Sequence, residues 1–147
     1  MTKASTIIAL AALTVSGCVV YSDGDPNGDV VVVDSSPNFS PYITWADAGC
    51  FYDAAYRDDI WYFEAAVDDG NGPLDVVAVY ADVYDSYTGQ WVETFELFPT
   101  SDPYMWYSDW LGASTYLSCY YRGYEVDIVA YDVFDAFDAT TIIPYTY

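Results

Sequence analysis

The chain has 147 residues, 54% of them hydrophobic and 20% aromatic, and a formal net charge of −20 at neutral pH. So many apolar side chains can build a buried core, which excludes the disordered state that such a charge would otherwise suggest. With 23 acidic residues against three basic ones, the composition also argues against a nucleic-acid partner, because nucleic acids are bound mainly through cations that neutralise phosphates.

The first 17 residues have the three parts of an export signal. Lys3 supplies the positive charge, residues 4–15 form an apolar stretch, and Ser16 and Gly17 are the small residues before the cleavage point. The apolar stretch is too short for a transmembrane helix, which needs about 20 residues. We therefore predict that residues 1–17 are a signal peptide and not part of the fold.

The tetrapeptide Val15-Ser16-Gly17-Cys18 resembles the lipobox of bacterial lipoproteins. The resemblance implies that Cys18 becomes the first mature residue and carries acyl chains, palmitate among them, which anchor the protein in a membrane. Val19 follows the cysteine where enteric bacteria use Asp to retain a lipoprotein in the inner membrane, so the resemblance favours the outer membrane. The alternative is an ordinary secretory signal that happens to end at a cysteine.

Residues 18–40 are rich in Ser, Asp, Asn, Gly and Pro around one valine run, a composition that predicts an acidic, flexible tether. Within it, residues 23–29 together with Asp34 have the oxygen-ligand spacing of an EF-hand calcium loop. The likeness is partial, because Pro26 stiffens the turn, Asp34 replaces the usual bidentate Glu, and no helix-forming sequence flanks the loop. A solvated linker is the favoured interpretation.

From residue 41 onward, apolar and polar residues alternate as they do in strands, with turn signals about every ten residues. The strand beginning at residue 60 is predicted to put Trp61, Phe63, Ala65 and Val67 on one apolar face. Residues 108–123, between the fifth and sixth predicted strands, look irregular and are predicted to hold a short helical turn. The predicted strands span residues 42–46, 60–67, 74–84, 90–98, 104–107, 124–132 and 140–145. Seven strands without a helix predict one antiparallel β-sandwich.

The sixth predicted strand runs from Tyr124 to Asp132, and a tyrosine there starts an alternating apolar strand that ends before an acidic turn. This run resembles the sixth strand of immunoglobulin-like and fibronectin type III domains. The resemblance implies an immunoglobulin-like β-sandwich over residues 41–147. The cysteine, tryptophan, cysteine arrangement of antibody domains is missing, because the cysteines fall in predicted loops.

Two cysteines remain once Cys18 is acylated, and an exported chain lives where disulfides form and persist. In a seven-strand sandwich the first, third and fifth loops share one pole. Cys50 is predicted in the first loop and Cys119 in the fifth, so the two should meet and form a disulfide. The alternative is a pair of buried free thiols.

The same geometry gathers acidic residues of the second and sixth loops at the opposite pole, with Asp102 of the fourth loop nearby. Such carboxylates repel one another unless a cation intervenes, and Ca²⁺ takes oxygens from loops of this kind. The candidate calcium ligands are Asp68, Asp69, Asn71, Asp132, Asp135 and Asp138. The alternative is a hydrated acidic cluster without a specific ion.

An enzyme is not expected, because the mature chain has no His or Lys and the disulfide would leave no free thiol. Zinc is not expected for the same reason. Trp106 and Trp110 lie in an aromatic run too dense for one inward face, so they are candidate ligand-binding residues unless they pack in the core. We expect a lipid-anchored envelope protein with a structural or protein-binding role. The alternative is a calcium-dependent carbohydrate-binding module, so the expected partners are envelope proteins or glycans.

Overall fold

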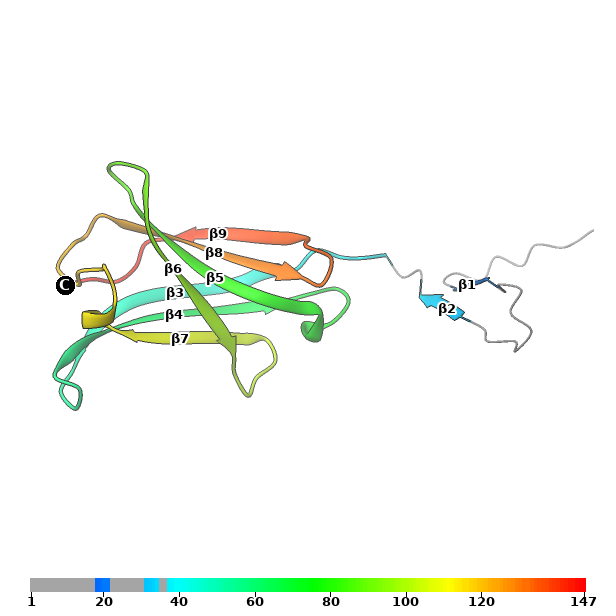
Figure 1. Ribbon diagram of the computed structural model, residues 1–147, viewed down its shortest axis with the longest axis horizontal. Helices are drawn as coiled ribbons and strands as arrows, with labels where there is room; N and C mark the ends of the chain where they lie inside the picture. The colour runs from blue at the N-terminus through cyan, green and yellow to red at the C-terminus, as the bar shows by residue number, and fades with distance from the viewer. Residues whose placement is uncertain (1–17, 22–30, 35–36) are drawn as a thin grey trace, which may run out of the picture. The chain divides into compact units, whose positions relative to one another are not determined.

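The computed structural model describes residues 18–21, 31–34 and 37–147, in two separate units (Figure 1). The first unit, residues 1–37, contains an antiparallel hairpin of β1 (Cys18–Tyr21) and β2 (Val31–Asp34), so the valine run of the predicted tether is paired. The predicted signal peptide and the EF-hand-like loop at residues 23–29 lie outside the described residues. Within the described part of the chain, no helix has the length and apolar character needed to cross a membrane.

The second unit, residues 38–147, is built from seven strands, and every neighbouring pair among them is antiparallel. The strands are β3 (Tyr42–Asp53), β4 (Asp58–Asp68), β5 (Val76–Asp85), β6 (Gln90–Pro99), β7 (Met105–Leu111), β8 (Tyr124–Asp132) and β9 (Phe137–Ile142). Two 3₁₀ turns, η1 (Pro73–Asp75) and η2 (Gly112–Ser114), interrupt the connections. The prediction of an all-β, seven-strand antiparallel fold is confirmed, as is the short helical turn after β7.

The seven strands form one continuous sheet in the order β3-β4-β7-β6-β5-β8-β9. Only two residue pairs join β6 to β7, and Figure 1 shows β6 running obliquely from its long pairing with β5 toward β7. At the other side, Tyr145 forms a parallel bridge with Gly49 of β3. The sheet is therefore nearly closed into a barrel, and the predicted division into two separate sheets is not clear in the structure.

The core lies inside this curled sheet and is lined by the inward-facing residues, which alternate with outward-facing ones along the strands. Trp61, Phe63, Ala65 and Val67 of β4 are all buried, as their alternation predicts. The rings pack directly, because the centroid of Phe63 lies 4.6 Å from that of Phe95 in a stacked arrangement. The predicted apolar face of β4 is therefore the centre of the core.

Cys50 lies on β3 and not in the first loop, so that part of the prediction is wrong. Strand β3 continues to Asp53 because its backbone pairs with β4 as far as Asp58, which moves the hairpin turn four residues beyond the cysteine. Cys119 lies in the connection from β7 to β8, as predicted. The two form the predicted disulfide, with their Cα atoms 5.7 Å apart.

Candidate functional site

Carboxylates of the second and sixth loops meet at one pole of the barrel, where the backbone N–H of Val133 donates to the carbonyl of Asp75 over 3.1 Å. One oxygen from each of Asp69, Asp75 and Asp132 lies within 4.8 Å of the others. We call these three residues the carboxylate cluster. Asp69 is 4% exposed and Asp132 is 1% exposed, so the cluster is largely removed from water.

Asp132 organises the sixth loop through its side chain. Its Oδ1 accepts the backbone N–H groups of Phe134 and Ala136, each over 2.8 Å, and its Oδ2 accepts the side-chain amide of Asn38 over 2.7 Å. Burial acts to raise the pKa of Asp132, but the hydrogen bonds from Asn38, Phe134 and Ala136 together outweigh it and hold the pKa below its ordinary value. Asp132 is therefore an ionised carboxylate at neutral pH.

The other two members of the cluster each have a buried oxygen without a hydrogen-bond partner. Oδ1 of Asp69 accepts the backbone N–H of Asn71 over 2.7 Å, whereas Oδ2 of Asp69 and Oδ2 of Asp75 accept nothing. Burial, and then the negative charges of Asp69 and Asp132, raise the pKa of Asp75. The structure thus concentrates negative charge at a place where its own donors do not balance it.

Of the five aspartates among the predicted calcium ligands, the structure brings Asp69 and Asp132 into the carboxylate cluster. Asp68 accepts the hydroxyl of Tyr42 over 2.6 Å, and Oδ2 of Asp138 accepts the backbone N–H of Ile43 over 2.8 Å. Asn71 accepts the backbone N–H of Phe39 through its side-chain oxygen, and Asp135 occupies an exposed turn with a φ of 63°. Asp102 organises the turn between β6 and β7 by accepting the backbone N–H of Tyr104.

Sequence reasoning missed Asp75, because it placed this residue inside the strand predicted for residues 74–84. Strand β5 begins only at Val76, and Asp75 closes the 3₁₀ turn that Pro73 starts. The available signal was Pro73 itself, which suits the first position of a helical turn and lacks the N–H that a strand would use.

The two predicted ligand-binding tryptophans have different environments. Trp106 is 6% exposed and belongs to the core, whereas Trp110 is 37% exposed at the end of β7. The indole N–H of Trp110 donates to the hydroxyl of Ser108 over 3.3 Å, and its ring lies 5.7 Å from that of Phe95. Only Trp110 of the pair presents substantial ring surface to solvent.

A second group of candidate side chains lies on the outer surface of β6, β5, β8 and β9, and sequence reasoning did not bring them together as one site. On β5 and β8 these side chains alternate with buried residues, so they point away from the core. Trp91 of β6 and Phe137 of β9 lie on the same face because they pair with Tyr84 and Tyr131. We call the set the aromatic–acidic face: Tyr80, Tyr84, Trp91, Tyr131, Phe137, Asp82, Glu96, Glu125 and Asp127.

Cross-strand register sets the rings and carboxylates of this face side by side. Tyr84 lies between Trp91 on β6 and Glu125 on β8. The indole N–H of Trp91 donates to the hydroxyl of Thr94 over 3.0 Å, and that hydroxyl donates in turn to Asp82. The Trp91 ring is thus oriented by the carboxylate of the neighbouring strand.

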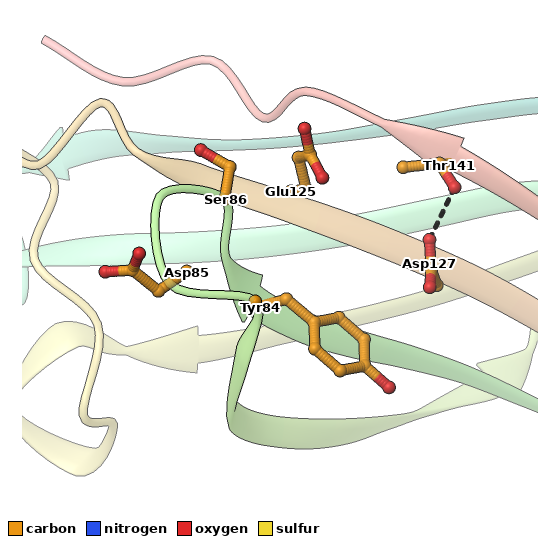
Figure 2. A pocket seen from close by; sticks show the side chains of 7 residues that line it. Tyr84, Asp85, Ser86, Glu125, Asp127 and Thr141 are labelled. Atoms are coloured by element: carbon orange, nitrogen blue, oxygen red, sulfur yellow. Dashed lines mark hydrogen bonds between the residues drawn. The ribbon is translucent and has the colours of Figure 1, made fainter.

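A shallow, open pocket of about 230 Å³ lies at one end of this face (Figure 2). Figure 2 shows the carboxylate of Asp127 turned toward Thr141, whose hydroxyl donates to it over 2.6 Å. Burial, followed by the charges of Asp82 and Asp127, raises the pKa of Tyr84, so its hydroxyl stays protonated and able to donate. The pocket offers carboxylates and hydroxyls beside one aromatic ring.

The face could have been found from the sequence by taking the outward members of the alternating strands, since Tyr80, Asp82 and Tyr84 interleave with Val79, Ala81 and Val83 on β5. Such a search needs the strand order, which a single sequence does not supply.

No protein-family model, curated protein or solved structure shows a significant match to the chain.

Proposed function

We propose that this protein is a lipid-anchored, non-enzymatic binding protein of the bacterial cell envelope, and that its aromatic–acidic face binds a positively charged protein partner. The observation that carries the proposal is the composition of this face. It groups five aromatic rings with four carboxylates, and the strands that form it contain no Lys or Arg.

The chemistry of the face suits an Arg- or Lys-containing surface. Tyrosine and tryptophan rings supply contact area at a low cost in conformational entropy, and they attract cations to their faces. Adjacent carboxylates pair with guanidinium and ammonium groups and accelerate the encounter through long-range attraction. The composition supports this choice, because only Arg57 and Arg122 oppose 23 acidic residues once the predicted signal is removed.

An immunoglobulin-like sandwich is the finer fold assignment that we propose. When the seven strands of the second unit are numbered along the chain, their order across the sheet is first, second, fifth and fourth, followed by third, sixth and seventh. These two groups have the strand composition of the two sheets of an immunoglobulin constant-type domain. The hydroxyl of Tyr124 accepts the backbone N–H of Ser118 over 3.1 Å. This bond supports the assignment, because a tyrosine at the start of the sixth strand bonds upstream backbone in the tyrosine corner of such domains.

A carbohydrate ligand is the second candidate, and the pocket of Figure 2 favours it. The ring of Tyr84 lines the pocket together with the carboxylates of Glu125 and Asp127. Sugar rings stack on aromatic faces and offer hydroxyls to carboxylates, so a terminal sugar is the ligand of this chemistry. Such a ligand is uncharged, which separates the two candidates by their response to salt.

We expect membrane partitioning to depend on Cys18. In cells expressing Cys18→Ala, the protein should move from the membrane fraction to the soluble fraction, because the acyl chains of the proposed anchor need this thiol. Detergent phase separation and mass spectrometry of the N-terminal peptide measure the change, with Val19→Ala, which keeps the thiol, as the control for a substitution at the neighbouring position. Unchanged partitioning of Cys18→Ala would contradict the proposed anchor.

The binding face is tested by Trp91→Ala on an array that carries both basic peptides and glycans. We expect the wild-type protein to bind basic peptides at about 0.05 M NaCl and to lose them at about 0.5 M. Trp91→Ala should weaken this binding by about tenfold or more, since buried tryptophans dominate many interfaces. Trp45→Ala, on β3, removes another exposed ring, 47% exposed against 60% for Trp91, and should bind as the wild type does.

The array separates the outcomes. Binding to glycans that survives high salt and is lost in Trp91→Ala would replace the protein partner by a carbohydrate. Equal binding by Trp91→Ala and the wild type would remove the face from the function.

A further inference from the structure

We propose that Asp69, Asp75 and Asp132 form a binding site for Ca²⁺ between the second and sixth loops. The inference goes beyond the proposed function and does not rest on it, since the carboxylate cluster shares no residue with the aromatic–acidic face. It also differs from the calcium ligands expected from sequence, because Asp75 enters the set and four of the six predicted residues leave it.

The first step is the pair of carboxylate oxygens that the fold buries without a partner. The side chain of Asp69 is only 4% exposed, and its Oδ2 accepts no hydrogen bond. Oδ2 of Asp75 is also buried and accepts none. A buried polar atom without a partner costs free energy, more so when it carries charge. Two such atoms beside the buried carboxylate of Asp132 indicate a positively charged ligand.

The second step is the location of the basic side chains. Arg57 lies in the turn between β3 and β4, and Arg122 lies just before β8, where its Nε donates to the carbonyl of Tyr147 over 2.7 Å. Both positions are at the opposite end of the strands from Asp69 and Asp132. Within residues 37–147, therefore, the chain places no basic side chain where it could neutralise the cluster.

The third step is the chemistry of the donors. All three side chains offer oxygen, and Ca²⁺ binds oxygen ligands at about 2.3–2.6 Å. Two ligands on opposite sides of one ion then lie about 5 Å apart, so oxygens within 4.8 Å of one another can share it. Asp132 keeps capacity for such a bond, because its Oδ2 accepts a single hydrogen bond, from Asn38. Water supplies the remaining ligands.

The test uses the full chain and two variants that each remove one carboxylate charge. In about 10 mM CaCl₂ the melting temperature of the wild type should rise by about 10 °C over NaCl of equal ionic strength, if the dissociation constant is about 10⁻⁴ M as in extracellular modules. Asp75→Asn should lose this shift. Asp135→Asn, in the sixth loop but outside the cluster, is the matched control and should keep it.

Isothermal titration calorimetry in about 0.15 M NaCl gives the second readout. At this salt concentration, screening suppresses the non-specific attraction of Ca²⁺ to the acidic surface. One calcium per chain in the wild type and in Asp135→Asn, and none in Asp75→Asn, supports the site. Asp69→Asn replaces Asp75→Asn if the latter is unfolded by circular dichroism. An equal rise in melting temperature with NaCl, or calcium binding that survives loss of Asp75 or Asp69, overturns the proposal.

Discussion

Replacing both Cys50 and Cys119 by alanine is expected to lower the free energy of unfolding by about 4 kcal/mol. The bridge closes a loop with a sequence separation of 69 residues, and the chain-entropy model gives about this value for such a loop. Cys50 is 0% exposed and Cys119 is 3% exposed, so the bond is protected from reductants in the folded state. Urea unfolding of the wild type and the double variant measures the difference.

Reduction supplies the control for this prediction. Unfolding the wild type in dithiothreitol should give the midpoint of the double variant, whose own midpoint should not respond to the reductant. Both cysteines belong to the core. Alanine is chosen in preference to serine because a serine hydroxyl would be buried without a hydrogen-bond partner. A loss below about 1 kcal/mol would show that the denatured chain is already compact without the bridge.

Phe63→Ala is expected to cost about 3–5 kcal/mol of unfolding free energy, the range for removing a large aromatic side chain from a core. Phe63 is fully buried at the centre of β4, stacked on Phe95 at 4.6 Å and lying 6.3 Å from Trp61. These rings are held on two strands, β4 and β6, which cannot close over the cavity without breaking their ladders. A domain with a stability of about 5–15 kcal/mol would be left close to unfolding.

Phe134→Ala is the matched control for this prediction, because Phe134 is 70% exposed in the β8–β9 loop and should change stability by no more than about 0.5 kcal/mol. Urea melts of the two variants under the same conditions give the comparison. A cost for Phe63→Ala below about 1.5 kcal/mol would mean that the neighbouring rings refill the space, and that the core is less tightly specified than its packing indicates.

Strands whose outer face is polar were predictable from sequence, because burial of one face enforces strict alternation. In β4 and β8 every inward residue of the pattern, from Trp61 to Val67 and from Tyr124 to Ala130, is buried. Strand β3 was predicted seven residues too short, since Asp47, Ala48 and Gly49, which follow the predicted end, have little intrinsic strand preference. Its continuation to Asp53 comes from pairing with β4, a tertiary effect that local sequence does not encode.

The carboxylate cluster was predictable only in outline. Alternation and loop order place the second and sixth loops at one pole, which the structure confirms through the bond from Val133 to Asp75. Which carboxylates converge depends on backbone torsions such as the φ of 114° at Gly72 and 63° at Asp135. Glycine permits a positive φ, but residue type does not specify these values. The same holds for Trp106 and Trp110, which share one side of β7 but differ in exposure because Trp110 lies near the strand's end.

The segment around Tyr145 that bridges to β3 also covers part of a sheet edge. A strand at the edge of a sheet normally exposes a row of unpaired N–H and C=O groups that template pairing with other chains. Here Tyr145 occupies such groups of Ala48 and Cys50, and the carboxylate of Asp138 takes the N–H of Ile43. With these groups of β3, one of the two end strands of the sheet, already occupied, the domain leaves neighbouring copies less backbone on which to nucleate aggregation.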